Sequence, residues 1–151
     1  VTSSMDNTIR LWDIRKATTQ LTITQHTKSV RLMVSHPREM TMCSADSLGR
    51  FKQWVLPKGE LLDEWQTTKL NNMIVNSLAI NPIEDTLFAG YDDGKMEFYD
   101  YKTGQLLQKL KTPAAPGTTG STIFASAFDN LGSRLVTCES DKAIKIWSPK
   151  E

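Results

Sequence analysis

Side chains that could carry out hydrolytic chemistry occur near both ends of the chain. The candidates are Thr2, Asp6, His26, Thr137 and Asp141. Catalysis of this kind needs a nucleophile, a base and an orienting group at one accessible point. The same polar types instead recur in several similar segments, so we expect them to be spread over separate structural units. The sequence therefore favours a structural role for these residues and predicts that the protein is not an enzyme.

Other kinds of chemical site find little support. No glycine-rich phosphate loop opens a helix, and no group of residues has metal-ligand spacing, so we expect no cofactor, metal or small-molecule substrate. Cys43 and Cys138 stand in apolar runs without a CxxC pattern, which predicts two buried, reduced thiols of an intracellular protein. The net charge of +1 and the hydrophobic content of 39% are those of an ordinary soluble globular chain. No apolar run is long enough to span a membrane.

An aromatic residue ends each of four short alternating runs, which read TIRLW, RFKQW, KMEFY and AIKIW. These aromatic residues, separated by 42, 45 and 48 positions, are Trp12, Trp54, Tyr99 and Trp147. An aspartate stands six residues before three of them, at Asp6, Asp93 and Asp141. A repeat of this length is the signature of an array of similar structural units.

Each repeat reads as four strands. In the second repeat the predicted strands are 30–34, 40–45, 50–54 and 60–65. In the third they are 75–80, 86–91, 95–101 and 105–110. Apolar alternation and punctuation by Pro, Gly, Asn and Asp favour this reading. Residues 60–73 also have helical spacing, but the matching segment of the next repeat reads as a strand, so we reject the helix. Four-stranded units of about 40–45 residues predict an all-β protein in which each unit is one blade of a β-propeller.

The phrase DNTIRLWD (6–13), and His26 fourteen residues after Trp12, resemble WD40 repeats. The resemblance implies that Asp, His, Ser or Thr, and Trp form a structural hydrogen-bonded tetrad in each blade. When the WD40 tetrad is transferred to this sequence, its positions are Thr2, Asp6, Trp12, His26, Asp46, Trp54, Asp93, Thr137, Asp141 and Trp147.

The carry-over is incomplete in three of the blades. Met42 stands where the second blade should have a hydroxyl, and Asp46 lies eight rather than six residues before its Trp. The third blade has Ala89 and Tyr99, with Asn71 near the His position, and the fourth lacks a His. His36, before a proline, is expected to be an exposed turn residue.

Longer stretches are similar to the C-terminal blades of the pleiotropic regulator family. They are KSVRLMVSHPR (28–38), FKQWVLPKG (51–59), IFASAFDNLGSRLVTCESDKAIKIW (123–147) and the insertion TPAAPGTTGST (112–122). Members of that family are WD40 subunits of the spliceosomal NineTeen complex. The resemblance implies a nuclear scaffold that binds other protein subunits during pre-mRNA splicing.

The blade boundaries follow from the same count. We expect strands c and d of one blade in 1–24, full blades in 25–66 and 67–111, and the insertion with strands a to c of a last blade in 112–151. The resemblance implies seven blades in all. The chain begins in mid-repeat, which suggests a partial propeller whose last blade awaits a closing strand.

Two other functions remain open. A WD40 chain could be a substrate receptor of a ubiquitin ligase, or a signalling or corepressor scaffold. Direct RNA binding is the second alternative, because residues 10–52 hold eight basic side chains against three acidic ones. Scattered, solvated charge explains that excess equally simply.

The partner surface is expected on the side of the blades that carries the d–a and b–c loops. Strands alternate in direction, so these loops emerge at the same end of each sheet. Arginine is favoured in interfaces for its planar group with several donors. The partner-binding candidates are Lys28, Arg31, Arg50 and Asn76. The insertion 112–122 is a further d–a loop on that side, whereas Arg38 and Lys58 belong to turns at the opposite end.

Overall fold

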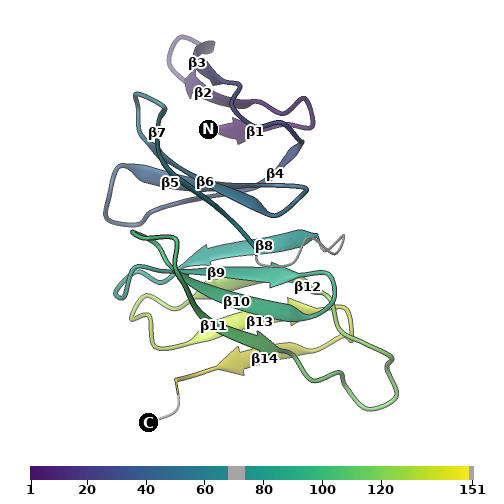
Figure 1. The fold of residues 1–151 in the computed structure, drawn as a ribbon. Coiled ribbons are helices and arrows are strands. Elements are labelled where there is room, and N and C mark those ends of the chain that lie inside the picture. Colours follow the sequence, from purple (N-terminus) through teal and green to yellow (C-terminus); the bar gives the residue numbers. More distant parts are fainter. Residues whose placement is uncertain (68–73, 150–151) are drawn as a thin grey trace. The chain divides into compact units, whose positions relative to one another are not determined.

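The computed structural model describes residues 1–67 and 74–149, which form four antiparallel β-sheets (Figure 1). The all-β prediction is confirmed. No helix that could cross a membrane occurs among these residues. The chain divides into two compact units, Val1–Asn72 and Met73–Glu151.

The first unit contains two sheets. One has the order β1-β2-β3, and its strands are β1 (Thr2–Ser3), β2 (Ile9–Asp13) and β3 (Thr18–Ile23). The other has the order β4-β5-β6-β7, and its strands are β4 (Val30–Ser35), β5 (Thr41–Asp46), β6 (Arg50–Val55) and β7 (Glu60–Gln66). The helix considered for residues 60–73 is therefore absent over Glu60–Gln66, while residues 68–73 lie outside the described part of the chain.

The second unit also contains two sheets. The first comprises β8 (Val75–Ile80), β9 (Thr86–Tyr91), β10 (Lys95–Asp100) and β11 (Leu106–Lys111), in chain order. The second comprises β12 (Ile123–Phe128), β13 (Leu135–Glu139) and β14 (Ile144–Trp147). Each sheet is a meander of neighbouring strands (Figure 1).

Apolar side chains pack the sheets together in pairs. In the first unit Ile9, Leu11, Ile23, Val30, Met42 and Trp54 form one buried cluster. In the second unit Ala79, Phe88, Met96, Ile123 and Leu135 form another. Ser77 and Ser126 also share a hydrogen bond of 2.6 Å between β8 and β12. Each sheet therefore buries a face against its neighbour within the same unit.

Register shifts in the strand pairing recur at equivalent positions of the sheets. The pairing of a third strand with the fourth shifts just before Trp12, Trp54 and Tyr99. The pairing of a first strand with the second shifts at Arg31, Asn76 and Phe124, the residues left between two paired neighbours. A β-bulge bends a strand and re-aims the extra side chain. The repeat is thus a repeat of backbone geometry as well as of residue type.

Candidate functional site

A tryptophan N–H donates to a hydroxyl ten residues earlier in three of the four sheets. Trp12 Nε1 lies 2.9 Å from Thr2 Oγ1, Trp54 Nε1 2.8 Å from Ser44 Oγ, and Trp147 Nε1 3.0 Å from Thr137 Oγ1. Each pair joins the last or next-to-last residue of one strand to the strand beside it. Trp54 is fully buried, and a buried indole N–H needs an acceptor, which Ser44 supplies; Trp12 and Trp147 make the same bond at more exposed positions.

The predicted position of the hydroxyl in the second repeat is wrong. The sequence comparison assigns this position to Met42, whereas the structure places the hydroxyl at Ser44. Met42 is the residue directly opposite Trp54 in the β5–β6 pairing, and it packs in the apolar cluster. Ser44 is the diagonal neighbour on the same face, within reach of the indole. A count of ten residues back from each aromatic would have found it.

Asp46, His26 and Ser44 are brought together beside Trp54. His26 Nε2 lies 2.8 Å from Ser44 Oγ, and His26 Nδ1 lies 3.7 Å from Asp46 Oδ2. Burial raises the pKa of Asp46, but the nearby His26 imidazole and the hydrogen bonds from the Arg50 and Leu48 amides outweigh it and hold the pKa below its ordinary value. An ionised Asp46 therefore faces the imidazole and orients it.

An acid, a histidine and a serine in this order resemble a hydrolytic triad, but the geometry opposes catalysis. Ser44 is fully buried, and its hydroxyl accepts the Trp54 N–H while it faces His26. A nucleophile must be accessible to its substrate. The arrangement can fix the positions of β5, β6 and the segment before β4, and it offers no surface on which a substrate could react.

The third repeat replaces this arrangement with a carboxylate. Tyr99 stands at the Trp position and Ala89 at the hydroxyl position. The fully buried Glu97 accepts hydrogen bonds from the phenols of Tyr91 and of Tyr99, the latter at 2.5 Å. Lys95 Nζ lies 2.8 Å and Lys109 Nζ 3.4 Å from its other oxygen. Asn71, expected near the His position, lies outside the described residues.

The fourth repeat has a carboxylate where the second has Asp46. Glu139 and Asp46 both stand eight residues before the Trp. Glu139 accepts from Thr137 Oγ1 at 2.8 Å and from Lys145 Nζ at 2.6 Å. Burial raises the pKa of Glu139, but hydrogen bonds led by Lys145 and Ser121 lower it overall. Burial lowers the pKa of Lys145, and Glu139 and Asp141 raise it overall. A buried ion pair thus takes the place of the missing imidazole.

The aspartates six residues before an aromatic share a different geometry. Asp6, Asp93 and Asp141 each accept the main-chain N–H two residues later, at 3.0–3.1 Å. The residue that follows each one has a positive φ: Asn7, Gly94 and Lys142. Side-chain acceptors of this kind stabilise tight turns. These aspartates therefore fix the turn between the second and third strands, and Asp46 makes equivalent bonds to Leu48 and Arg50.

Two predictions about single side chains are wrong. His36 is buried, and its Nδ1 accepts the amides of Arg38 at 3.2 Å and Glu39 at 3.0 Å, which closes the turn after β4. Cys43 and Cys138 are both unpaired, but only Cys43 is buried. Cys138 follows Thr137 in β13 and so points to the opposite, exposed face of its sheet. No cluster of metal-ligating side chains occurs in residues 1–67 and 74–149.

The basic partner-binding candidates of the first unit lie at one end of their sheet. Val30 pairs with Asp46, and Arg50 pairs with Gln66, so Lys28, Arg31 and Arg50 share that end. Arg50 Nη1 donates to Thr27 Oγ1 at 3.2 Å, which brings it beside the segment before β4. The turns that carry Arg38 and Lys58 lie at the other end, where Thr41 pairs with Val55. In the second unit Asn76 occupies the bulge of β8, as Arg31 does in β4.

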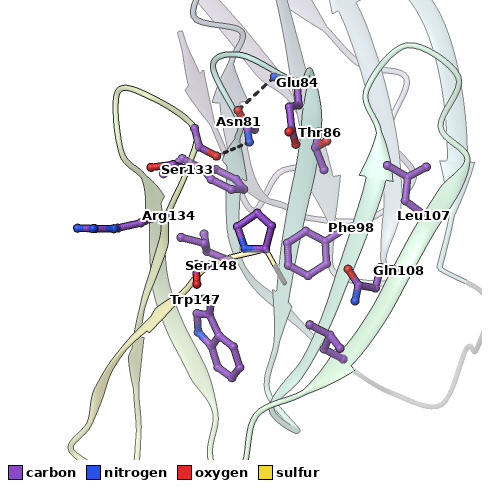
Figure 2. Close-up of a pocket in the computed structure, with 15 residues that line it drawn as sticks. Asn81, Glu84, Thr86, Phe98, Leu107, Gln108, Ser133, Arg134, Trp147 and Ser148 are labelled. Atoms are coloured by element: carbon purple, nitrogen blue, oxygen red, sulfur yellow. Dashed lines mark hydrogen bonds between the residues drawn. The ribbon is translucent and has the colours of Figure 1, made fainter. Parts of the chain in front are cut away.

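A cleft of about 700 Å³ opens in the second unit beside β14. Figure 2 shows Phe98, Leu107 and Gln108 on one wall, with Trp147 and Arg134 across from them. The inner lining is apolar, and Glu84, Ser133 and Arg134 make one end polar. Among the described residues β14 pairs with β13 alone, and Trp147, Ser148 and Pro149 at its C-terminal end line the cleft. The cleft therefore offers apolar surface from both sheets of the second unit.

Residues 1–13 and 104–148 match the family model for the WD domain, G-beta repeat. Together with four antiparallel sheets and a tryptophan–hydroxyl pair in three of them, this match places the chain among the WD40-repeat proteins.

Curated relatives narrow the family. Pre-mRNA-splicing factor PRP46 of Debaryomyces hansenii is 61% identical over 112 residues, which cover 74% of this chain and 27% of that protein. PRP46 of Candida albicans is 57% identical over 98 residues, or 61% of this chain and 25% of that protein. Protein pleiotropic regulator PRL2 of Arabidopsis thaliana is 41% identical over 132 residues, which cover 86% of this chain and 27% of that protein. The chain is homologous to this pleiotropic regulator family, and it spans about a quarter of the length of these relatives.

Proposed function

We propose that this chain is part of a non-enzymatic scaffold of the pre-mRNA splicing machinery, a WD40 subunit of the NineTeen complex that acts in the nucleus. The observation that carries the proposal is the 61% identity to a protein named as a pre-mRNA-splicing factor. The buried polar clusters support the absence of catalysis, since their acids, imidazole and hydroxyls bond to one another inside the sheets.

The four sheets fit the predicted blades of a partial propeller. In this proposal residues 1–24, 25–66, 67–111 and 112–151 belong to four successive blades of seven. The cleft beside β14 supports this assignment, because a strand added there would complete a four-stranded last blade. An added strand would also cover the unpaired edge that β14 presents among the described residues.

The partner surface lies, in this proposal, at the sheet ends that carry Lys28, Arg31, Arg50 and Asn76. Lys28 and Arg31 are exposed, and Arg50 is half-buried. Arg31 and Asn76 are displayed by bulges, which present single side chains outside the regular pairing. Arginine at such a position can bind carboxylates of protein subunits with two parallel hydrogen bonds, whereas a rim lysine acts mainly on the rate of encounter.

The test is a pair of matched charge reversals in the full-length protein. Arg31→Glu with Arg50→Glu should reduce co-purification of splicing subunits at least several-fold. Arg38→Glu with Lys58→Glu, at the other end of the same sheet, should leave it unchanged. Thermal melting of both variants checks that they fold. Equal loss from both pairs, or loss from the control pair alone, would refute the surface assignment.

The same variants separate the alternatives. Co-purification of ubiquitin-ligase or signalling subunits, without splicing subunits, would show that the protein is a scaffold of a different complex. RNA binding predicts an affinity that falls steeply with added salt and that decreases in the Arg31→Glu, Arg50→Glu variant. A salt-independent or absent RNA signal would exclude direct contact through this end of the sheet.

A further inference from the structure

The insertion between β11 and β12 is fixed at both of its ends. Thr112 and Ser121, both buried, donate to the same carboxylate of Glu139. The Thr112 Oγ1 distances to its two oxygens are 2.9 and 2.7 Å, and the Ser121 Oγ distance is 2.5 Å. Thr112 N also donates to Gly94 O at 2.9 Å. The carboxylate thus draws the two ends of the loop together.

Two further bonds hold the first half of the loop from within. Lys145 Nζ donates to Pro113 O at 2.6 Å, and Ala115 N donates to Asp141 Oδ2 at 3.0 Å. Lys145 and Asp141 are themselves joined at 3.1 Å. The main chain of the Pro113–Pro116 segment is therefore tied to β14 and to the turn between β13 and β14, with no use of its own side chains.

Gly94, in the turn before β10, allows the two ends of the insertion to pack closely against that turn. Gly94 has a φ of +78°, and a Cβ built on it would lie 2.9 Å from Thr112 Cγ2 and would collide with the Ser121 carbonyl. Thr122 Oγ1 also donates to Asp92 O at 2.6 Å. The base of the loop therefore rests on a turn of the neighbouring sheet in the same unit, and only glycine permits the contact.

The sequence Pro-Ala-Ala-Pro favours one backbone shape. Proline fixes φ near −65°, and the residue before a proline is pushed to extended conformations. Pro113, Pro116, Thr112 and Ala115 are all restricted in this way, and residues 112–115 form neither helix nor strand. In a polyproline II helix three residues make one turn, which would place Pro113 and Pro116 on one side. Pro116 also opens the turn that the Thr118 N–Ala115 O hydrogen bond of 3.1 Å closes, so the extended stretch ends there. Pro113, Ala114 and Pro116 are exposed.

We propose that Pro113–Pro116 is a docking segment for a proline-recognition module, a partner domain with an aromatic-lined groove of the SH3 or WW kind. Such grooves bind Pro-x-x-Pro segments in the polyproline II conformation. The hydrogen bonds at Glu139, Lys145 and Asp141 hold the segment before it binds, which reduces the ordering cost of association. The exposed Lys111 offers a cation to an acidic flank of the groove. This inference does not depend on the splicing role.

The experiment uses the full-length protein immobilised on a sensor and a panel of purified SH3 and WW domains as probes. We expect saturable binding of one or more of these domains, and about a tenfold or greater loss of affinity in the Pro113→Ala, Pro116→Ala variant. Thr119→Ala, in the same loop outside the segment, is the matched control and should bind like the parent. Melting curves establish that all variants fold. No binding by any domain, or equal binding by the double variant, would overturn the proposal.

Two more measurements test the role of the anchors. Gly94→Val alters no residue of the segment but displaces the base of the loop, and it should weaken binding of the same domain. A synthetic peptide of residues 111–118 should compete less well than the intact protein, because it is not held in shape. A peptide that binds as tightly as the protein, with Gly94→Val unchanged, would show that the anchors contribute nothing and would overturn the claim of a preformed segment.

Discussion

The sheet that contains Trp54 and the sheet that contains Tyr99 solve one problem in two ways. Each places a large aromatic side chain in a fully buried position with a polar hydrogen that needs an acceptor. In the first, Ser44 accepts the indole N–H and is backed by His26 and Asp46. In the second, Glu97 accepts the phenol of Tyr99 directly. The two sheets show that the repeat preserves a satisfied buried donor and leaves the chemistry of the acceptor free.

The difference has an energetic consequence. A hydroxyl acceptor is neutral, so its removal leaves unpaired dipoles. A carboxylate acceptor is charged, and in the sheet of Tyr99 it also neutralises Lys95 and Lys109. Removing one partner of a buried ionic group leaves charge behind in a region of low dielectric constant. The Tyr99 sheet should therefore tolerate loss of its acceptor less well than the Trp54 sheet.

The largest effect is expected for Glu97→Ala. Two phenols lose their acceptor and two ammonium groups lose their counter-ion, and we expect a loss of about 3–5 kcal/mol in the free energy of unfolding, as for other broken buried ion pairs. Chemical denaturation of the full-length protein measures it. The exposed Glu84, on the turn between β8 and β9, is the control, and Glu84→Ala should change stability by less than about 0.5 kcal/mol. Equal stability of the two variants would contradict the comparison.

A smaller loss is expected for Ser44→Ala. The Trp54 N–H and His26 lose a buried partner, which typically costs about 1–3 kcal/mol. Ser44→Thr should lose less, because Thr2 and Thr137 provide the same hydroxyl at the matching positions. The exposed Ser35 supplies the matched control, Ser35→Ala. If Ser44→Ala melted like the wild type, the hydrogen bond would have no role in holding the strands.

The smallest effect concerns pH. The pKa of Glu139 is lowered in the folded protein, so its contribution to stability is complete above the unfolded value of 4.5 and is lost as the pH falls through the folded pKa. Asp46 behaves in the same way from its ordinary value of 3.8. Melting temperatures should therefore fall below about pH 4.5. Glu139→Gln should flatten part of that decline, whereas the exposed Glu84→Gln should not. Identical acid profiles for all three proteins would refute the assignment.

The sequence was sufficient to predict where the strands lie, but it was not sufficient to predict which polar side chains accept hydrogen bonds from the buried aromatic residues. Alternation of apolar residues along RFKQW or KMEFY depends only on near neighbours, and it located the third strands at β6 and β10 correctly. Met42 was preferred to Ser44 because both lie in the same apolar run, and only the register decides which of them reaches the indole. Glu97 was not singled out at all, since a lone acidic residue in an alternating strand ordinarily reads as solvent-facing.

The sequence alone determined the all-β fold, the repeat and the position of the aromatic residue in each unit, because these follow from the period of two along a strand and the spacing of the turns. Only the tertiary structure decided which side chains meet. Glu139 accepts hydrogen bonds from the hydroxyls of Thr112 and Thr137, 27 and 2 residues away, and so anchors an insertion that the sequence identifies only as a loop. His36, predicted to be an exposed turn residue, is buried and accepts the Glu39 amide N–H within its own turn. Contacts of this kind depend on strand register, on the bulges that shift it and on packing between sheets, and no local pattern encodes them.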